Sequence, residues 1–171
     1  FGPADPQPKP DDWGAIGAWS WGLSRVVDYL SGDRALDAGK IALSGASRLG
    51  KTTLWAAAQD PRIALVMPVI SGEGGAALSR RDYGETIAAI TDPARYGYWF
   101  APRYRSYADR VGALPVDSHM LLSLIAPRPM LLVTGDADAW SDPRGEFLAA
   151  QAAAPVYALY GKAGPGAVQP A

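Results

Sequence analysis

The chain predicts an α/β fold with a parallel sheet, and two observations support this class. Residues 64–70 and 129–134 are short, almost wholly apolar runs, as expected of parallel strands that are covered on both faces. Segments whose apolar residues have helical spacing alternate with such runs, which indicates helical connections between parallel strands. With 171 residues, 49% of them hydrophobic, the chain can bury the core of a single domain.

The first half of the chain is expected to hold two helices and two strands. Apolar residues recur every three or four positions from Trp13 to about Leu30, which is the pattern of a helix with one buried stripe. Asp11 or Asp12 can cap the start of this helix. The later elements follow in order: a strand at 40–44, a helix at 49–59 and a strand at 64–70.

The second half is less regular but ends with the same alternation. It begins with a weakly helical segment at 84–90 and an aromatic segment at 96–107 that has no clear period. The elements expected after these are a helix at 118–125, a strand at 129–134, a helix at 145–153 and a fourth strand at 156–160. This order completes the prediction of a parallel α/β sheet.

Composition excludes several classes of function. A net charge of −1 gives no electrostatic basis for binding nucleic acid or an anionic membrane. No apolar run approaches the roughly 20 residues of a membrane span, and the absence of cysteine excludes disulfides and cysteine-based zinc sites. His119 is the only histidine, so a site that needs histidine must use this residue or obtain one from outside the chain.

The two ends suggest that residues 1–171 form one incomplete domain. The chain starts with Phe1 rather than Met, and both ends are rich in Pro and Gly, which is typical of loops. The core is therefore expected within residues 11–162.

The most informative motif lies in residues 41–55 and fits two different kinds of site. Gly45-x-x-x-x-Gly50-Lys51-Thr52 matches a phosphate-binding loop, in which backbone N–H groups and Lys51 would hold phosphates and Thr52 would hold Mg²⁺. The same stretch also looks like a nucleophile elbow, the strand-to-helix turn that would lift Ser47 above the sheet of a hydrolase.

Each interpretation has a weakness. The strand after the motif ends in Ser71-Gly72 rather than in a metal-coordinating Asp, which weighs against a nucleotide site. Asp136 and Asp138 follow a later strand, where an α/β-hydrolase places its triad acid. The usual elbow reads G-x-S-x-G, however, and Leu49 occupies its second glycine position. Spacing alone leaves both interpretations open.

Ser44-Gly-Ala-Ser-Arg-Leu-Gly-Lys51 resembles the nucleophile motif G-x-S-R-x-G-K of the glucuronoyl esterases, carbohydrate esterase family 15. Further blocks at 11–19, 21–25, 71–81, 114–121, 126–129 and 138–147 resemble the same family in the same order. The resemblance covers most of residues 11–162. It implies an α/β-hydrolase fold, a three-layer αβα sandwich, of which this chain would hold the middle and later part.

The resemblance also implies a chemistry: hydrolysis of esters between 4-O-methyl-glucuronic acid on xylan and lignin alcohols, without metal or organic cofactor. Ser47 would be the nucleophile that forms an acyl-enzyme, and Arg48 would stabilise the oxyanion together with backbone N–H groups. Lys51 matches a lysine that binds sugar hydroxyls, Trp140 matches a tryptophan at the edge of the sugar, and Glu85 is a further candidate for sugar contact. A polymeric substrate implies a secreted or periplasmic protein.

These residues also have plain structural interpretations. Ser47 could cap a helix, Arg48 could form a surface ion pair, and Lys51 could be solvated in the first helical turn. Trp140 could belong to the core, and Glu85 could lie on a solvated helix face.

The triad acid remains open at this point. Fungal members of the family carry a glutamate at the position of Ile70, which cannot serve. Asp138 fits the position that bacterial members use, after the later strand, and Asp136 is the close alternative. Glu73 lies near the fungal position but is shifted, and any acid in the later loop could also be a turn former.

His119 precedes the acid loop, which is the wrong order for the base of this fold. We interpret it as a structural histidine that is hydrogen-bonded near the sheet edge, and we expect the catalytic histidine beyond the last residue of this chain. The isolated 171 residues should then be inactive and poorly soluble. A phosphate-loop nucleotide binder and a non-catalytic glucuronoxylan-binding protein are the alternatives.

Overall fold

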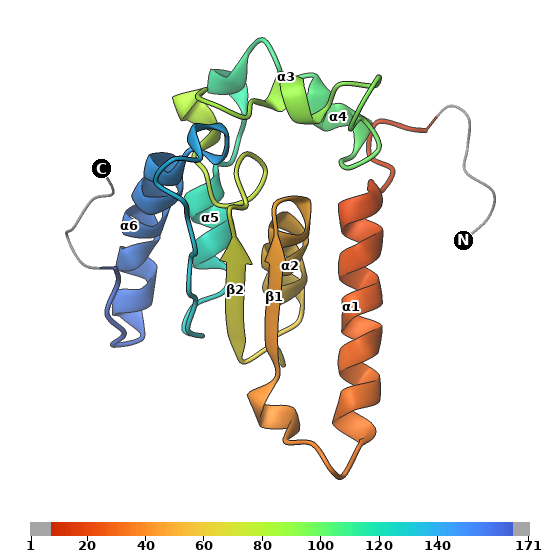
Figure 1. The fold of residues 1–171 in the computed structure, drawn as a ribbon, viewed down its shortest axis with the longest axis vertical. Helices are drawn as coiled ribbons and strands as arrows, with labels where there is room; N and C mark the ends of the chain where they lie inside the picture. The colour runs from red at the N-terminus through yellow and green to blue at the C-terminus, as the bar shows by residue number, and fades with distance from the viewer. Residues whose placement is uncertain (1–7, 166–171) are drawn as a thin grey trace.

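A parallel sheet forms the centre of the computed structural model, which describes residues 8–165 (Figure 1). Strand β1 (Ala42–Ala46) pairs in parallel with β2 (Leu65–Val69), with Ala42 opposite Leu65 and Ala46 opposite Val69. Residues 129–133 continue the sheet beyond β2 through isolated parallel bridges from Val66 to Met130 and from Val69 to Val133. The predicted parallel arrangement of these three segments is therefore confirmed.

The helices cover one face of this sheet. Helix α2 (Arg48–Gln59) contacts both strands and lies between α1 (Ala15–Gly32) and α5 (Ser118–Ser123), and α6 (Pro143–Leu159) packs on α5. The main core is made by apolar side chains of all these elements: Val27, Leu54, Ala56, Ala57, Ile63, Val66, Ala76, Leu122, Ile125, Ala149 and Ala153. On the opposite face of β1 alternate residues are exposed. The described residues thus supply the strand layer and one helical layer of the expected αβα arrangement.

Residues 70–117, between β2 and α5, form a long excursion that crosses the carboxyl ends of the strands (Figure 1). It carries two short helices, α3 (Ile87–Ile90) and α4 (Pro102–Arg105), and the 3₁₀ turns η2 (Ser79–Arg81) and η3 (Val111–Ala113). The other two 3₁₀ turns are η1 (Ala38–Lys40) and η4 (Ala139–Ser141). The excursion is anchored by a second apolar cluster of Ile16, Ile90 and Trp99. The aromatic segment without a period is therefore a packed loop.

The start of α1 differs from the prediction in how it is capped. The backbone N–H groups of Ala15 and Ile16 donate to the carbonyls of Tyr98 and Trp99, at 2.8 and 3.1 Å. Gly14 is the N-cap residue and makes no side-chain cap bond, so a cap by Asp11 or Asp12 was wrong. A backbone partner from the excursion replaces the side chain that usually satisfies these orphan donors.

The largest error of the prediction lies at the end of the chain. A helix at 145–153 followed by a strand at 156–160 was wrong, because α6 continues to Leu159 through Pro155. The alanine-rich run before Pro155 favours helix, and the Tyr157 hydroxyl donates to the Arg128 carbonyl at 3.1 Å, which holds the last turn in place. Tertiary contact thus outweighs the local tendency of proline to break a helix.

The predicted boundaries of two strands also shift. Lys40 belongs to η1, where the Asp37 side chain accepts a bond from the Gly39 N–H at 3.0 Å, so β1 begins and ends two residues later than expected. The run at 129–134 makes only isolated bridges, in part because Pro129 has no N–H to donate to a ladder.

Candidate active site

The turn between β1 and α2 consists of one residue, Ser47. Its backbone has φ 55° and ψ −125°, a conformation that side chains other than glycine rarely adopt. The Ser47 N–H donates to the Val69 carbonyl at 2.9 Å, and its side chain makes no cap bond to α2. Interpretation of Ser47 as a helix cap is therefore wrong. A serine held in strained backbone between a strand and a helix is the geometry of a nucleophile elbow.

Two glycines make room for this turn and explain the unusual motif. A side chain at Gly45 would place its Cβ 2.5 Å from the Leu49 carbonyl oxygen, and one at Gly50 would lie 3.0 Å from the Ser71 Cβ. Leu49 itself is half exposed. Because the tight contact with β2 occurs at residue 50, the second small residue of this elbow is needed one position later than in G-x-S-x-G.

The same geometry does not fit a phosphate-binding loop. Such a site needs an open loop whose N–H groups surround the phosphates, but here a single residue, Ser47, separates β1 from α2. The Lys51 side chain is 1% exposed, and the Thr52 hydroxyl donates to the Arg48 carbonyl at 2.9 Å. The Thr52 hydroxyl is therefore not free to hold Mg²⁺.

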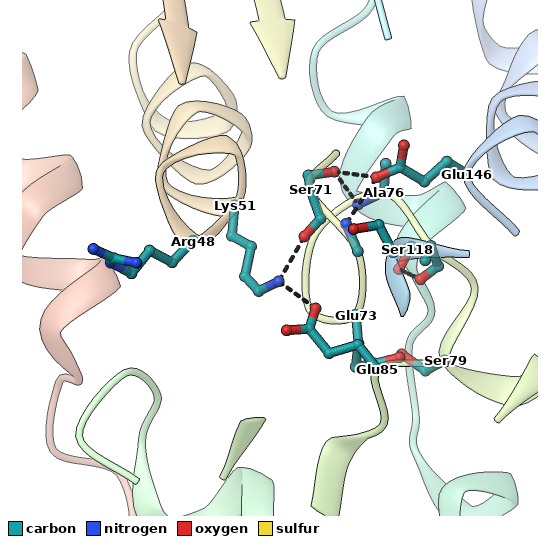
Figure 2. Close-up of polar contacts among 12 residues, drawn as sticks. Arg48, Lys51, Ser71, Glu73, Ala76, Ser79, Glu85, Ser118 and Glu146 are labelled. Carbon is teal, nitrogen blue, oxygen red and sulfur yellow. Dashed lines mark hydrogen bonds and ion pairs between the residues drawn. The ribbon is translucent and has the colours of Figure 1, made fainter. Parts of the chain in front are cut away.

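Lys51 forms a buried ion pair with Glu85 (Figure 2). The Lys51 Nζ donates to Glu85 Oε2 at 2.7 Å and to the Ser71 carbonyl at 2.6 Å. Glu85 is 7% exposed, and its N–H donates to the Trp140 carbonyl at 2.6 Å. The interpretations of Lys51 and Glu85 as solvated helix residues are therefore wrong. The structure brings together Lys51 and Glu85, with the Trp140 backbone beside them.

Aromatic side chains surround this basic region. Arg48 is exposed and extends away from the ion pair in Figure 2. The Arg48 guanidinium and the Lys51 Nζ each lie 6.0 Å from the centre of the Trp99 ring. Trp99 is buried, and within residues 8–165 its Nε1 has no hydrogen-bond partner. Lys51 and Trp99 line a cavity of about 340 Å³ together with Trp13 and Trp55. Trp99 was not predicted, because the aromatic segment has no period that marks it.

The three candidate acids differ in environment. Asp138 is half-buried at the start of η4, where its carboxylate accepts the Ser141 hydroxyl at 2.7 Å and the Ser141 N–H at 3.2 Å. Asp136 is exposed. Glu73 is buried and accepts hydrogen bonds from the hydroxyls of Ser79 and Tyr104. Burial raises the pKa of the Glu73 carboxyl, and these hydrogen bonds oppose that rise.

One acidic residue of this region was missed by the sequence analysis. Glu146, in the first turn of α6, is 1% exposed. It accepts a hydrogen bond from the Ser71 hydroxyl (Figure 2) and another from the Gly72 N–H. Burial raises the pKa of its carboxyl. An acid in the first turn of a helix usually faces solvent, where the helix dipole stabilises its negative charge. The position of Glu146 in the sequence therefore gave no sign that this residue is buried.

His119 lies in the first turn of α5 and is partly buried. Within the described chain its Nδ1 is buried without a hydrogen-bond partner, so the structural hydrogen bond that we expected for this nitrogen is not formed there. Among the described residues no hydrogen bond joins its side chain to Ser47 or to Asp138.

The parallel strands, the helix that follows the first of them and the serine elbow between the two define an α/β-hydrolase fold with a serine at its nucleophile position. Comparison with known proteins agrees with this class. The family model described as glucuronyl esterase, fungi, matches residues 8–161. Carbohydrate esterase MZ0003, from an unknown prokaryotic organism, is 49% identical over 157 residues, which are 92% of this chain and 36% of that protein.

Two further comparisons extend this result. 4-O-methyl-glucuronoyl methylesterase 1 of Wolfiporia cocos is 35% identical over 154 residues, which are 86% of this chain and 38% of that protein. The structure of a promiscuous CE15 esterase from a marine bacterial metagenome superposes with a TM-score of 0.90 and 47% identity, over 98% of this chain and 42% of that one. The chain belongs to the glucuronoyl esterases of carbohydrate esterase family 15, and it spans about two fifths of the length of these relatives.

None of the helices found in residues 8–165 combines the length and the apolar character of a membrane span.

Proposed function

We propose that the protein containing this chain is a serine carboxylic-ester hydrolase that cleaves 4-O-methyl-glucuronoyl esters between xylan and lignin alcohols. The observation that carries the proposal is the strained Ser47 elbow, placed one helical turn from the buried Lys51–Glu85 pair. An ester carbonyl above Ser47 would have a nucleophile on one side and polar groups for sugar hydroxyls close by. Because a polymeric substrate does not enter the cell, we place the enzyme outside the cytoplasm, secreted or in the periplasm.

The reaction would begin with attack of the Ser47 hydroxyl oxygen on the uronoyl carbonyl. A general base takes the hydroxyl proton and later gives it to the leaving alcohol, so that an acyl-enzyme remains. The first backbone N–H groups of α2 have no partner within the helix, and together with the exposed Arg48 they can stabilise the negative charge that develops on the carbonyl oxygen. Water then releases the uronic acid by the same steps.

Recognition of the sugar would fall to three residues. The Lys51 ammonium has three protons, and two of them are used by Ser71 and Glu85, so the third can donate to a sugar hydroxyl. Among the described residues Glu85 Oε1 accepts no hydrogen bond and can receive one from the same sugar. Trp140 is 52% exposed and offers an apolar face to a pyranose ring.

We assign the triad acid to Asp138 and the base to a histidine outside the 171 residues. Asp138 lies in the loop that follows the third strand segment, where an α/β-hydrolase places its triad acid, whereas Glu73 is buried with its Oε1 bonded to Ser79 and Tyr104. Asp136 is the remaining alternative. Among the described residues no hydrogen bond joins His119 to Ser47, so we do not assign His119 as the base.

The test uses the full-length protein and methyl 4-O-methyl-glucuronate. The wild type should hydrolyse this ester, and a serine-reactive phosphonate should label Ser47. Ser47→Ala should lose turnover while it still binds the ester. Binding without turnover by the wild type would favour a non-catalytic glucuronoxylan-binding protein, and Mg²⁺-dependent nucleotide binding that is lost in Lys51→Ala would favour the phosphate-loop alternative.

A further inference from the structure

The carboxylate of Glu146 holds the loop that follows β2. Its Oε1 accepts two hydrogen bonds, from the Ser71 hydroxyl at 2.7 Å and from the Gly72 N–H at 2.8 Å (Figure 2). The Ser71 hydroxyl oxygen also accepts a hydrogen bond from the Ala76 N–H at 3.0 Å. Since a serine hydroxyl has a single proton, that proton is directed to Glu146. The orientation of Ser71 is thus fixed from both sides.

Ser71 and Gly72 in turn hold the ion pair of the candidate site. The Ser71 carbonyl accepts the Lys51 Nζ at 2.6 Å. Gly72 has φ +59°, and a Cβ there would lie 2.4 Å from Glu85 Oε2 and 3.5 Å from the Lys51 Nζ. The two residues that Glu146 binds therefore both lie against the Lys51–Glu85 pair. A small displacement of this loop would displace the ammonium group.

Charge gives a second reason for the arrangement. The Lys51 ammonium pairs directly with Glu85, and it attracts the carboxylates of Glu146 and Glu73, which are also buried. Lys51 is the one cation among these four groups. Because Ser71 lies between Lys51 and Glu146, the carboxylate of Glu146 attracts Lys51 without replacing Glu85 as its direct partner.

We propose that Glu146 is a positioning residue for substrate binding: through Ser71 and Gly72 it fixes the Lys51 ammonium and the Glu85 carboxylate in the geometry that receives the sugar hydroxyls. The inference rests on the proposed function, because it assigns the ion pair to sugar recognition. It predicts that loss of Glu146 weakens binding of the uronoyl sugar more than it slows attack by Ser47.

The experiment compares Glu146→Leu, Glu146→Gln and Ser71→Ala in the full-length enzyme, with methyl 4-O-methyl-glucuronate and with p-nitrophenyl acetate, which has no sugar hydroxyls. In Glu146→Leu, KM for the glucuronate should rise about tenfold or more, while kcat/KM for the acetate stays within about threefold of wild type. The amide oxygen of Glu146→Gln can accept both hydrogen bonds, so this variant should recover most of the lost affinity. Ser71→Ala keeps the carbonyl that binds Lys51 and the bond from the Gly72 N–H to Glu146 but loses the hydroxyl bond, so it should raise KM for the glucuronate alone, by a smaller factor than Glu146→Leu, and it replaces the leucine variant if that variant does not fold.

Two outcomes would overturn the inference: an equal loss on both esters, or an unchanged KM for the glucuronate in Glu146→Leu and Ser71→Ala. Failure of the proposed function has a different signature, because the wild type itself would then not hydrolyse the glucuronate. In that case hydrogen exchange still tests the loop. The Gly72 amide should exchange about tenfold faster or more in Glu146→Leu than in Glu146→Gln, and equal rates would refute the role of Glu146.

Discussion

At the scale of single residues, the site depends on backbone conformations that most side chains avoid. Ser47 has φ 55° and ψ −125°, a backbone conformation that costs about 1–3 kcal/mol. Such strain persists only where the surrounding structure enforces it. Here the enforcing contacts are the bond from the Ser47 N–H to the Val69 carbonyl and the close approach of backbone at Gly45 and Gly50. These contacts hold Ser47 in the turn directly after β1.

The strain at Ser47 predicts opposite effects on stability and activity. Ser47→Gly should raise the free energy of unfolding by about 1 kcal/mol, because glycine adopts positive φ without cost. Ser47→Ala keeps the Cβ and should leave stability within about 0.5 kcal/mol of wild type. Both variants should lose esterase turnover. Urea unfolding measures the difference, and equal stability of the two variants would show that the turn is not strained.

Gly72 provides a second test, with Gly161 as its matched control. Both glycines have positive φ, at 59° and 68°, but only Gly72 has a close neighbour, Glu85 Oε2 at 2.4 Å from its would-be Cβ. Gly161→Ala should cost about 1 kcal/mol for the backbone alone. Gly72→Ala should cost about 2 kcal/mol more and should also raise KM for the glucuronate, because the ion pair must move. Similar losses in both variants would remove the steric argument.

At the scale of elements, the prediction was accurate where the signal for an element lies within its own residues. Helix α2 and strand β2 were predicted almost to the residue, because their apolar patterns and the Asp60-Pro61 stop are contained within them. Helix α6 was divided in two, since Pro155 is a local break signal and the contact of Tyr157 with Arg128 that outweighs it is distant in sequence. Non-local contacts are what a single sequence hides.

The candidate site shows the same division. Ser47 and Lys51 were found because they share one short motif, whereas the motif could not show that Lys51 is buried against Glu85, 34 residues away. Glu146 and Trp99 were missed entirely. Their importance comes from neighbours that the fold brings to them, Ser71 and Gly72 in one case and the basic side chains of α2 in the other.

Arg128 connects three parts of the helical layer. We expect its substitution to lower the free energy of unfolding more than that of any other surface side chain of this layer. Its guanidinium donates to the carbonyls of Ala57, Asp60, Ile63 and Ile125, at 2.6, 3.1, 2.9 and 3.2 Å. Arg128→Met would remove the partner of the Ala57 and Ile63 carbonyls, whereas the Asp60 and Ile125 carbonyls keep backbone N–H partners, and it should lower the free energy of unfolding by about 2–3 kcal/mol. Arg110→Met is the control, because Arg110 bonds only within its own exposed segment, and its effect should stay below about 0.5 kcal/mol. Equal effects in chemical denaturation would contradict the assignment.

At the scale of the whole molecule, buried acids should make stability depend on pH. Burial raises the pKa of the Glu146 carboxyl, so the folded protein binds this proton more tightly than the unfolded chain does. The contribution of Glu146 to stability is then fully present below its unfolded pKa and is lost as pH rises through its folded pKa. Asp60 acts in the opposite sense, because the hydrogen bond from Arg62 lowers its pKa to about 2, and its contribution is lost only as pH falls from about 4 toward that value.

This sign predicts the behaviour of Glu146→Gln, which removes the charge and keeps the acceptor. Its stability relative to wild type should increase between pH 4 and pH 8, because only the wild type must bury an ionised carboxylate at the higher pH. Urea unfolding at the two pH values measures the difference. A constant difference would mean that Glu146 titrates normally in the folded protein.

Within residues 8–165 the sheet has an open edge beyond its third strand segment. Residues 129–133 pair with β2 on one side, while Leu131 and Val133 are 54% and 39% exposed. Between this edge and α6 lies an apolar groove of about 640 Å³, lined in part by Leu131, Phe147 and Tyr157. An unpaired apolar edge is a template for pairing with another chain. The isolated 171 residues should therefore associate, as light scattering would detect.

Leu131→Lys should reduce that association, because a charge at the edge opposes pairing between copies. Tyr29→Lys is the matched control: Tyr29 is 73% exposed but lies on α1, on the far side of α2 from the edge (Figure 1). If general surface hydrophobicity caused association, both lysine variants would reduce it equally. If the edge causes it, only Leu131→Lys will do so.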